Sequence, residues 1–338
     1  MTARPSPREA MARLDEEARA RLRRAEHPRR VEAQLATLAD EPFSRDDWIY
    51  ERKLDGMRLL VHRHGADVTL RSRRHEDRTR AFPELVESVA EYVPRDAVLD
   101  GEVVAFEGSV TSFARLQGRI GLDNPTRARA TGIAVHLYLF DLLHLDGHDL
   151  RGLALRDRKR LLRATVRFED PLRYTPHRNR DGEAELQRAC DRGWEGLIAK
   201  KAGAPYTGGR SRRWLKLKCS RGQELVIGGW TTPRGTREGF GSLLLGHHTS
   251  DGLRYAGRVG SGFTAAALTR ITAQLRRLER PEPAFLDPPR LRDAHWAEPD
   301  LVAEIAFTEW TRDGRLRHPR FKGLRTDKDP AAVVRERP

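Results

Sequence analysis

From about residue 45 onward, the chain is a succession of short segments in which apolar and polar residues alternate, separated by glycine-containing turns. Such alternation is typical of strands with one face on a core and the other toward solvent. The sequence therefore predicts an α+β protein of antiparallel sheets with flanking helices. Strands are expected at 47–54, 57–65, 66–73, 96–106, 134–147, 195–201 and 213–219, and helices at 81–93 and 181–193.

The pattern changes near residues 219–224, which we interpret as a domain boundary. Beyond it, strands of similar length are expected at 224–230, 241–248, 253–260 and 301–310, with a helix at 264–279. A few short strands and one helix suit a small Greek-key barrel of the oligonucleotide-binding (OB) type. The predicted domains are a charged N-terminal extension over 1–30, a first domain over 31–221 and an OB-fold domain over 222–338.

Composition narrows the class of partner. The chain has 338 residues, with 63 Lys and Arg against 49 Asp and Glu, which gives a formal charge of +14. A polyanion such as nucleic acid fits this excess, because each neutralised phosphate releases counterions. Cys190 and Cys219 cannot build a disulfide framework or a four-ligand zinc site, which points to a reducing compartment. The sequence shows no signal-peptide core and no apolar run of about 18 residues, so an intracellular, non-membrane protein is expected.

The segment YERKLDGMRLL places Lys53 two residues before Asp55-Gly56, which we interpret as a hairpin turn between two strands. Lys53 is either an ordinary hairpin charge or a nucleophile. A lysine nucleophile must lose a proton from an ordinary pKa of about 10.4, and neighbouring cations or a bound metal would favour that loss. The segment alone does not decide between these interpretations.

Charged residues share faces on two other predicted strands. In RWLKLKC, Lys216 and Lys218 lie opposite the apolar Leu215 and Leu217, so both cations point the same way. They could decorate a solvated edge or face an anionic ligand. In VLDGEVVAF, Asp100 and Glu102 share a face in the same manner, and Glu195 begins another strand. Paired carboxylates suit a hard cation, but solvated acids are as common.

The order of these segments is specific. KLDGMR, RSRR, DGEVVAF, LFDLL, EGLIAK and WLKLK follow one another, and FTEWTRDGRLRHPRFKGLRTDK follows them at residues 307–328. This series closely resembles the covalent nucleotidyltransferases, in particular the bacterial ATP-dependent DNA ligases related to those of non-homologous end-joining. The resemblance covers about residues 31–328. It implies a nucleotidyltransferase (adenylation) domain, ATP-grasp-like in its sheets, followed by the OB domain.

The resemblance also implies roles for single residues. Lys53 would attack the α-phosphate of ATP and become lysyl-AMP. Lys216 and Lys218 would hold the α-phosphate, and Glu102 and Glu195 would serve Mg²⁺ (or Mn²⁺) and the ribose.

Other residues would bind the nucleoside and the DNA end. Arg58 would reach the ribose, Glu51 the adenine edge and Arg73 the 5′-phosphate of the nick. Phe140 would stack on adenine, or else be plain core. In the OB domain, Arg325, Asp327 and Lys328 match a motif that closes over the pyrophosphate. A hinge near 219–224 is implied, because the OB domain must swing away to bind DNA.

The implied substrate is nicked or broken double-stranded DNA in repair, with Ku-type end-binding proteins or other repair enzymes as partners. A monomer in the bacterial cytoplasm, associated with the nucleoid, is expected. The chain has no room for polymerase or nuclease domains, so a stand-alone ligase or an isolated ligase domain is expected. Two alternatives remain open: an RNA ligase or capping-type nucleotidyltransferase, and a catalytically silent nucleic-acid-binding protein.

Overall fold

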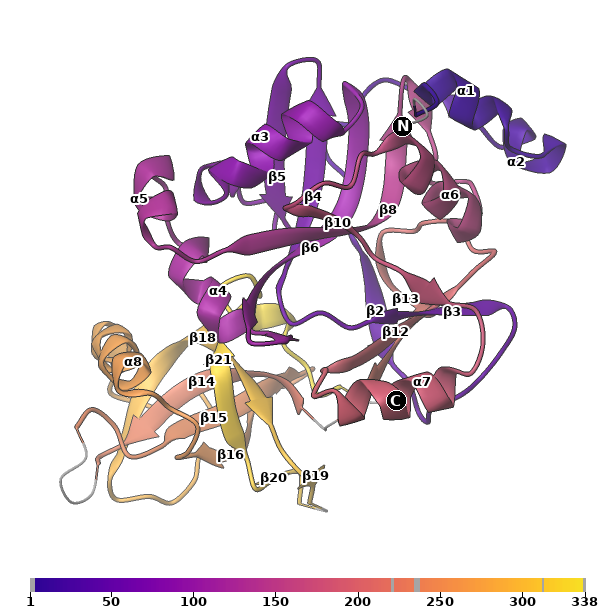
Figure 1. The fold of residues 1–338 in the computed structure, drawn as a ribbon. Helices are drawn as coiled ribbons and strands as arrows, with labels where there is room; N and C mark the ends of the chain where they lie inside the picture. Colours follow the sequence, from indigo (N-terminus) through magenta and orange to yellow (C-terminus); the bar gives the residue numbers. More distant parts are fainter. Residues whose placement is uncertain (1–3, 220–221, 234–237, 312, 337–338) are drawn as a thin grey trace. The chain divides into compact units, whose positions relative to one another are not determined.

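A computed structural model describes residues 4–219, 222–233, 238–311 and 313–336. The chain divides into two compact units, residues 1–219 and 220–337 (Figure 1). Residues 220 and 221, at the centre of the predicted hinge, lie outside the described residues.

The first unit contains two sheets. The larger sheet has the strand order β1-β9-β8-β6-β4-β5, and β10 and β7 are attached to β8 and β6. Its strands are β1 (Arg23–Arg24), β4 (Met57–His64), β5 (Asp67–Ser72), β6 (Asp96–Glu107), β7 (Val110–Thr111), β8 (Val135–Leu145), β9 (His148–Asp149) and β10 (Leu172–Tyr174). The smaller sheet has the order β11-β3-β12-β13-β2. Its strands are β2 (Gln34–Leu38), β3 (Trp48–Arg52), β11 (His177–Arg178), β12 (Gly196–Lys201) and β13 (Gly209–Lys218). Most pairs are antiparallel as predicted, whereas β13–β2 and β10–β8 are parallel.

Helices flank both sheets, as the α+β prediction requires. They are α1 (Pro7–Ala12), α2 (Glu16–Ala20), α3 (Pro83–Tyr92), α4 (Phe113–Ile120), α5 (Pro125–Ala130), α6 (Leu155–Thr165) and α7 (Gly182–Asp191), with a 3₁₀ turn at Thr79–Ala81. Helix α3 packs on β5, α6 on β8 and α7 on β12 (Figure 1). Helices α3 and α7 were predicted from the sequence, whereas α4, α5 and α6 were not.

The N-terminal segment is not a separate arm. Ala10, Met11, Leu14 and Ala18 are buried and belong to the main core of the first unit. A charged extension over residues 1–30 was predicted because charged residues dominate the composition of that segment. Those four apolar residues are enough to dock the two short helices, and α1 packs against α6.

The segment around Asp55-Gly56 is not a hairpin turn, which corrects the prediction. Strand β3 pairs with β11 and β12, whereas β4 pairs with β5 and β6, so the segment crosses from one sheet to the other. Asp55 accepts a hydrogen bond from the backbone N–H of Phe113, at the start of α4 (3.2 Å). A Cβ at Gly56 would lie 2.3 Å from the carbonyl oxygen of Val103 on β6. Glycine is needed here for close approach between backbones.

The second unit is an OB-like β domain. Its main sheet has the order β16-β15-β14-β18-β17, with β21 paired to β18. Its strands are β14 (Gly222–Thr231), β15 (Leu243–Thr249), β16 (Gly252–Val259), β17 (Glu279–Arg280), β18 (Ala294–Ala306) and β21 (Arg320–Leu324), beside the ribbon of β19 (Glu309–Trp310) and β20 (Leu316–Arg317). Helix α8 (Ala265–Arg277) buries Ile271 and Leu275 in the core of this unit, and a 3₁₀ turn at Pro330–Ala332 lies near the end. The strand-rich pattern and the single predicted helix are confirmed.

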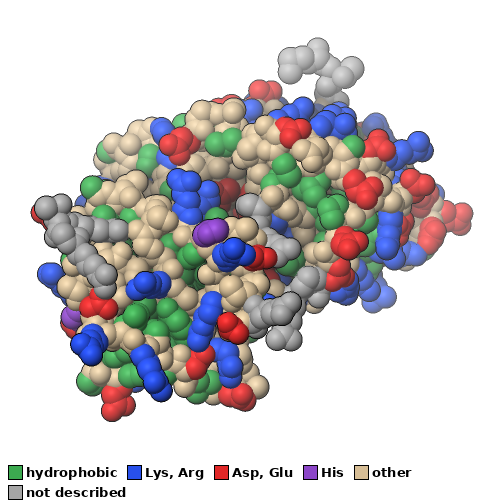
Figure 2. Space-filling view, turned by 90° about the horizontal axis from the view of Figure 1, so that it is seen from below, with side chains coloured by type: hydrophobic (Ala, Val, Ile, Leu, Met, Phe, Trp, Pro, Cys, Tyr) green, Lys and Arg blue, Asp and Glu red, His purple; other side chains and the backbone are tan. Residues whose placement is uncertain are grey.

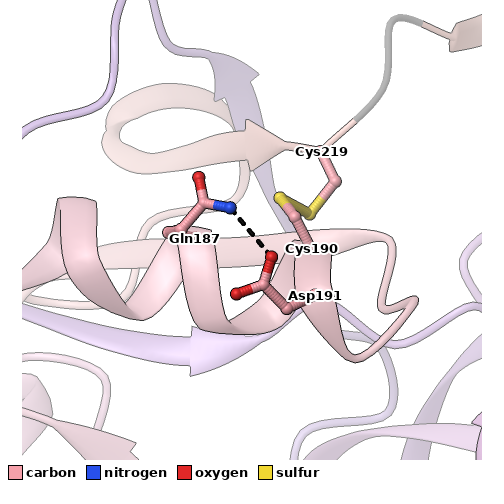
Figure 3. Close-up of a disulfide and its surroundings, with 4 residues drawn as sticks. All are labelled: Gln187, Cys190, Asp191 and Cys219. Atoms are coloured by element: carbon pink, nitrogen blue, oxygen red, sulfur yellow. Dashed lines mark hydrogen bonds between the residues drawn. A yellow bond between two sulfur atoms is a disulfide. The ribbon is translucent and has the colours of Figure 1, made fainter.

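The two cysteines are joined. A disulfide links Cys190 in α7 to Cys219, which follows β13, and beside it Gln187 donates a hydrogen bond to Asp191 (2.9 Å; Figure 3). It is one crosslink rather than a framework, but it removes the support that the cysteine count lent to a reducing compartment. It fixes α7 to the last strand before the second unit begins.

Candidate active site

Lys53 and Glu195 meet at the junction of β3 and β12. The Lys53 ammonium forms an ion pair with the Glu195 carboxylate, and both side chains are largely covered, at 18% and 27% exposed. The backbone N–H of Lys53 donates to the carbonyl oxygen of Gly196 (2.9 Å), which extends the β3–β12 ladder by one residue. The predicted nucleophile and the predicted acid are therefore brought together, although they are 142 positions apart in the sequence.

Glycine at position 196 makes this junction possible. Gly196 has a φ of +142°, and a Cβ there would lie 2.0 Å from the carbonyl oxygen of Leu217 on β13. A side chain would push β12 away from β13, and Glu195, the preceding residue, would move with it.

Strand β13 presents its two lysines on the predicted face. Leu215 and Leu217 pack in a cluster with Trp48 and Tyr50, whereas Trp214 packs in a different cluster with Phe140. Lys216 and Lys218 share the Trp214 face because side chains alternate along a strand. Lys216 pairs with Ile198 and Lys218 with Gly196, so both lie on the strand next to β12, which Glu195 directly precedes. The alternative of a solvated strand edge does not hold, because β13 lies between β12 and β2.

Glu51 is buried between two lysines that sequence analysis did not anticipate. Its carboxylate contacts the ammonium of Lys159 at 2.5 Å and that of Lys200 at 2.6 Å. Burial alone would raise the pKa of Glu51, but the two cations outweigh it and hold the pKa below its ordinary value. Burial lowers the pKa of Lys200 to about 8, although Glu51 opposes the shift.

Phe140 forms part of an aromatic wall beside this triad. It is 7% exposed and meets Trp214 edge to face, with ring centroids 6.0 Å apart. The Lys200 ammonium lies 4.0 Å from both ring centroids, and the Arg58 guanidinium lies 4.6 Å from that of Phe140. Cations over ring faces are held electrostatically, so the wall joins the two sheets at one place.

Arg58 is held by Asp100 on the neighbouring strand. Its guanidinium forms two hydrogen bonds with that buried carboxylate, which also accepts one from the hydroxyl of Tyr206 (2.7 Å). Asp100 is thus a positioning residue for Arg58. Glu102 pairs with Arg58 across β4 and β6, and a Cβ on Gly56 would lie 3.0 Å from the Glu102 Cγ. Glu102 therefore flanks the Lys53–Gly56 segment.

The remaining predicted residues lie elsewhere. Arg73 lies in the turn after β5 and is partly buried. In the second unit, Arg325 forms a two-bond ion pair with Asp327 (2.9 Å each), and Lys328 pairs with Glu224 at 2.8 Å. These three residues form one cluster within that unit.

Lys159, Lys200 and the partner of Asp141 were not predicted from the sequence. Lys159 lies in α6, next to Arg158, which forms a fully buried ion pair with Asp141 (2.7 Å). The segment RDRKRLLRA is so charged that it suggests a solvated helix. Neighbouring side chains on a strand point to opposite faces, so Lys200 and Lys201 in EGLIAKK could not both face solvent on one side, which was a usable signal.

Two models of known protein families match the chain. A family model described as the ATP dependent DNA ligase domain matches residues 31–218, and one described as the ATP dependent DNA ligase C terminal region matches residues 236–328. The chain belongs to the ATP-dependent DNA ligase family. The family assignment made from the sequence is confirmed, and the alternative functions are not favoured.

Individual relatives indicate which type of DNA ligase the chain resembles. The multifunctional non-homologous end joining protein LigD of Pseudomonas aeruginosa is 38% identical over 320 residues, which cover 92% of this chain. The LigD protein of Mycobacterium tuberculosis is 40% identical over 297 residues, or 86% of the chain. The chain spans 37% of the length of each. A solved structure of mycobacterial DNA ligase D complexed with ATP matches with a TM-score of 0.65 and 37% identity, covering 90% of this chain and 98% of that one.

Two further observations concern possible binding partners such as a membrane or DNA. Among the described residues, no helix combines the length and apolar character needed to span a membrane. On the face drawn in Figure 2, Lys and Arg side chains are interspersed with Asp and Glu side chains. The mixed charges on that face do not define a DNA-binding surface.

Proposed function

We propose that this ligase-family chain uses ATP to seal breaks in double-stranded DNA through a covalent lysyl-AMP on Lys53. The observation that carries the proposal is the partly buried Lys53–Glu195 pair, next to the strand that bears Lys216 and Lys218. A nucleophilic amine, a carboxylate and two cations then surround one phosphoryl group. Charge develops on phosphorus in every step, so positioned cations supply most of the stabilisation.

The proposed reaction has three steps. The Lys53 ammonium gives a proton to the Glu195 carboxylate, and the neutral Nζ attacks the α-phosphorus of ATP. The N–P bond forms as the bond to pyrophosphate breaks, pyrophosphate leaves, and the second proton on nitrogen is lost to solvent. The 5′-phosphate of the break then takes the AMP from Lys53. Finally, the 3′-hydroxyl attacks that 5′-phosphate, AMP leaves and the strand is closed.

The side chains around Lys53 would divide these tasks. Lys216 and Lys218 would neutralise the α-phosphate. The wall of Phe140 and Trp214 would receive the adenine, and Glu51, fixed by its two lysines, would orient it.

The sugar and the DNA end would be bound by arginines. Arg58, oriented by Asp100, would contact the ribose. Arg73 would contact the 5′-phosphate at the break. The cluster of Arg325, Asp327 and Lys328 would close over the pyrophosphate.

Mg²⁺ fits the residues present. Glu102 and Glu195 offer carboxylate oxygens from the two sheets on either side of the Lys53–Gly56 segment, and a hard cation prefers such ligands. When bound, the ion would neutralise phosphate charge.

The names of the relatives extend the proposal to a repair pathway and a partner. The names of the relatives favour end-joining repair, with a Ku-type protein as partner, on DNA in the bacterial cytoplasm. The chain would act as the ligase portion of such a system.

Nick sealing tests the proposal. Wild-type protein with ATP and Mg²⁺ should seal a nicked duplex, and Lys53→Ala should not. Lys201→Ala is the matched control, because Lys201 is an exposed lysine on β12. Sealing by Lys53→Ala would overturn the proposal. Failure of the wild type to seal with either ATP or GTP would also overturn it.

A further inference from the structure

One face of the larger sheet carries two separate sets of polar side chains, one at each end of its strands. On β4, Arg58, Leu60, His62 and His64 point to the same side because side chains alternate. Leu60 is buried in the middle, with Val98 and Leu143 beside it. The active-site residues occupy one end of this face. The other end holds a cluster of histidines and an aspartate that the proposed reaction does not use.

Three side chains in this cluster converge. A nitrogen of His27, a nitrogen of His64 and a carboxylate oxygen of Asp96 all lie within 4.8 Å of one another. The His27 Nδ1 is 2.7 Å from the Asp96 Oδ1, and the His64 Nδ1 is 3.5 Å from the same oxygen. Ligands of a tetrahedral Zn²⁺ with bonds of about 2.0–2.1 Å lie about 3.3–3.4 Å apart. The two distances from the Asp96 oxygen lie on either side of that spacing, and the two histidine nitrogens lie within 4.8 Å of each other.

Neighbouring groups already orient two of the three side chains. The His62 Nδ1 lies 3.3 Å from the His27 Nε2, the ring nitrogen that faces away from Asp96. The Asp96 Oδ2 accepts a hydrogen bond from the Gly147 N–H (2.8 Å) and lies 3.1 Å from the His144 Nε2. Metal ligands usually have such outer partners, which fix the ring and the carboxylate.

We propose that His27, His64 and Asp96 bind a borderline divalent cation, with Zn²⁺ as the best fit. Two imidazoles and one carboxylate suit Zn²⁺, with water at the fourth position, whereas Mg²⁺ prefers six oxygen ligands. The His64 side chain is 70% exposed, so the site is open to solvent.

The ion would tie the N-terminal segment to the sheet. His27 lies between β1 and β2, while His64 ends β4 and Asp96 begins β6, directly opposite it in the register. The ion would thus crosslink an irregular segment to two central strands. It would lie far from the reaction, because His64 is six positions along β4 from Arg58, or roughly 20 Å at about 3.3 Å per residue.

Calorimetric titration with ZnCl₂ tests the site in the full-length protein, stripped of metal with a chelator. Excess MgCl₂ is kept present so that carboxylates near Lys53 are occupied. We expect one Zn²⁺ per chain. His64→Ala should abolish this binding without unfolding the protein, because the side chain is exposed. His62→Ala and His144→Ala should weaken it about 10- to 100-fold, as expected for outer partners.

A matched control is His295→Ala, which removes a histidine paired with a single carboxylate, that of Glu279. It should bind Zn²⁺ as the wild type does. Absence of saturable binding in the wild type, or binding that His64→Ala leaves unchanged, would overturn the proposal and leave the cluster as a hydrogen-bonded anchor. This result does not depend on nick sealing, so it stands apart from a failure of the proposed function.

Discussion

Glu51 lies where water does not reach, and its charge is balanced by side chains from two other elements. Glu51, Lys159 and Lys200 are each 2% exposed. Such a buried cluster is stable only while every member is present, since removal of one leaves an uncompensated charge in the interior. Because its two lysine partners hold it in place, Glu51 presents a carboxylate in a fixed position to a ligand that binds beside Phe140.

Replacement of Glu51 by alanine should therefore lower the free energy of unfolding by about 3–5 kcal/mol, because two buried ammonium groups lose their partner. Urea denaturation of the purified proteins measures this change. The matched control is Asp40→Ala, which breaks the exposed pair with Arg212 and should change stability by less than about 1 kcal/mol. Equal effects of the two substitutions would contradict the account.

The stability that Glu51 contributes should depend on pH in a defined direction. Its pKa in the folded protein lies below the ordinary value of 4.5. The contribution is complete above that value, and it is lost as the pH falls through the lower, folded-state pKa. The difference in unfolding free energy between wild type and Glu51→Gln should thus be constant near neutral pH and shrink in acid. A difference that grows in acid would show that Glu51 is not held as a carboxylate.

At the scale of elements, the alternation of side chains places most of the site. Strand β13 could be predicted face by face, because Leu215 and Leu217 fix which side meets the core. The pairing of β3 and β4 could not, since Asp-Gly suggests a hairpin locally and only the long-range partners β12 and β6 decide otherwise. Helix α6 escaped prediction for a related reason: its Lys159 is buried by residues far away in sequence.

The disulfide acts at this same scale, since it fastens α7 to the end of β13. A crosslink with a sequence separation of 29 residues restricts the unfolded chain, and its loss should lower stability by about 3–4 kcal/mol. Thermal or urea unfolding of the Cys190→Ser/Cys219→Ser variant without reductant measures the loss. Reductant should bring the wild type to the level of the variant and leave the variant itself unchanged. Equal stability without reductant would show that the bond does not form.

For the whole molecule, composition and motif order predicted the class of partner and the family, but not the docking of the first 30 residues. Ala10 and Met11 are too few to stand out in a charged segment, and their burial depends on the surface that α6 offers. The histidine cluster was likewise not recognised, because its members come from four separate parts of the chain.

The net charge of +14 leads to a prediction about DNA binding. Contact with about six phosphates should make affinity for a nicked duplex fall roughly a thousandfold between about 50 and 200 mM salt. Fluorescence anisotropy at several salt concentrations measures the slope. An affinity that does not change with salt would mean that phosphate contacts contribute little.

The most direct test of the central claim is peptide mapping by mass spectrometry after incubation with ATP and Mg²⁺. The account predicts an AMP adduct on the peptide that contains Lys53, and none on the Lys53→Ala protein. An adduct on any other residue, or one that persists in Lys53→Ala, would contradict it.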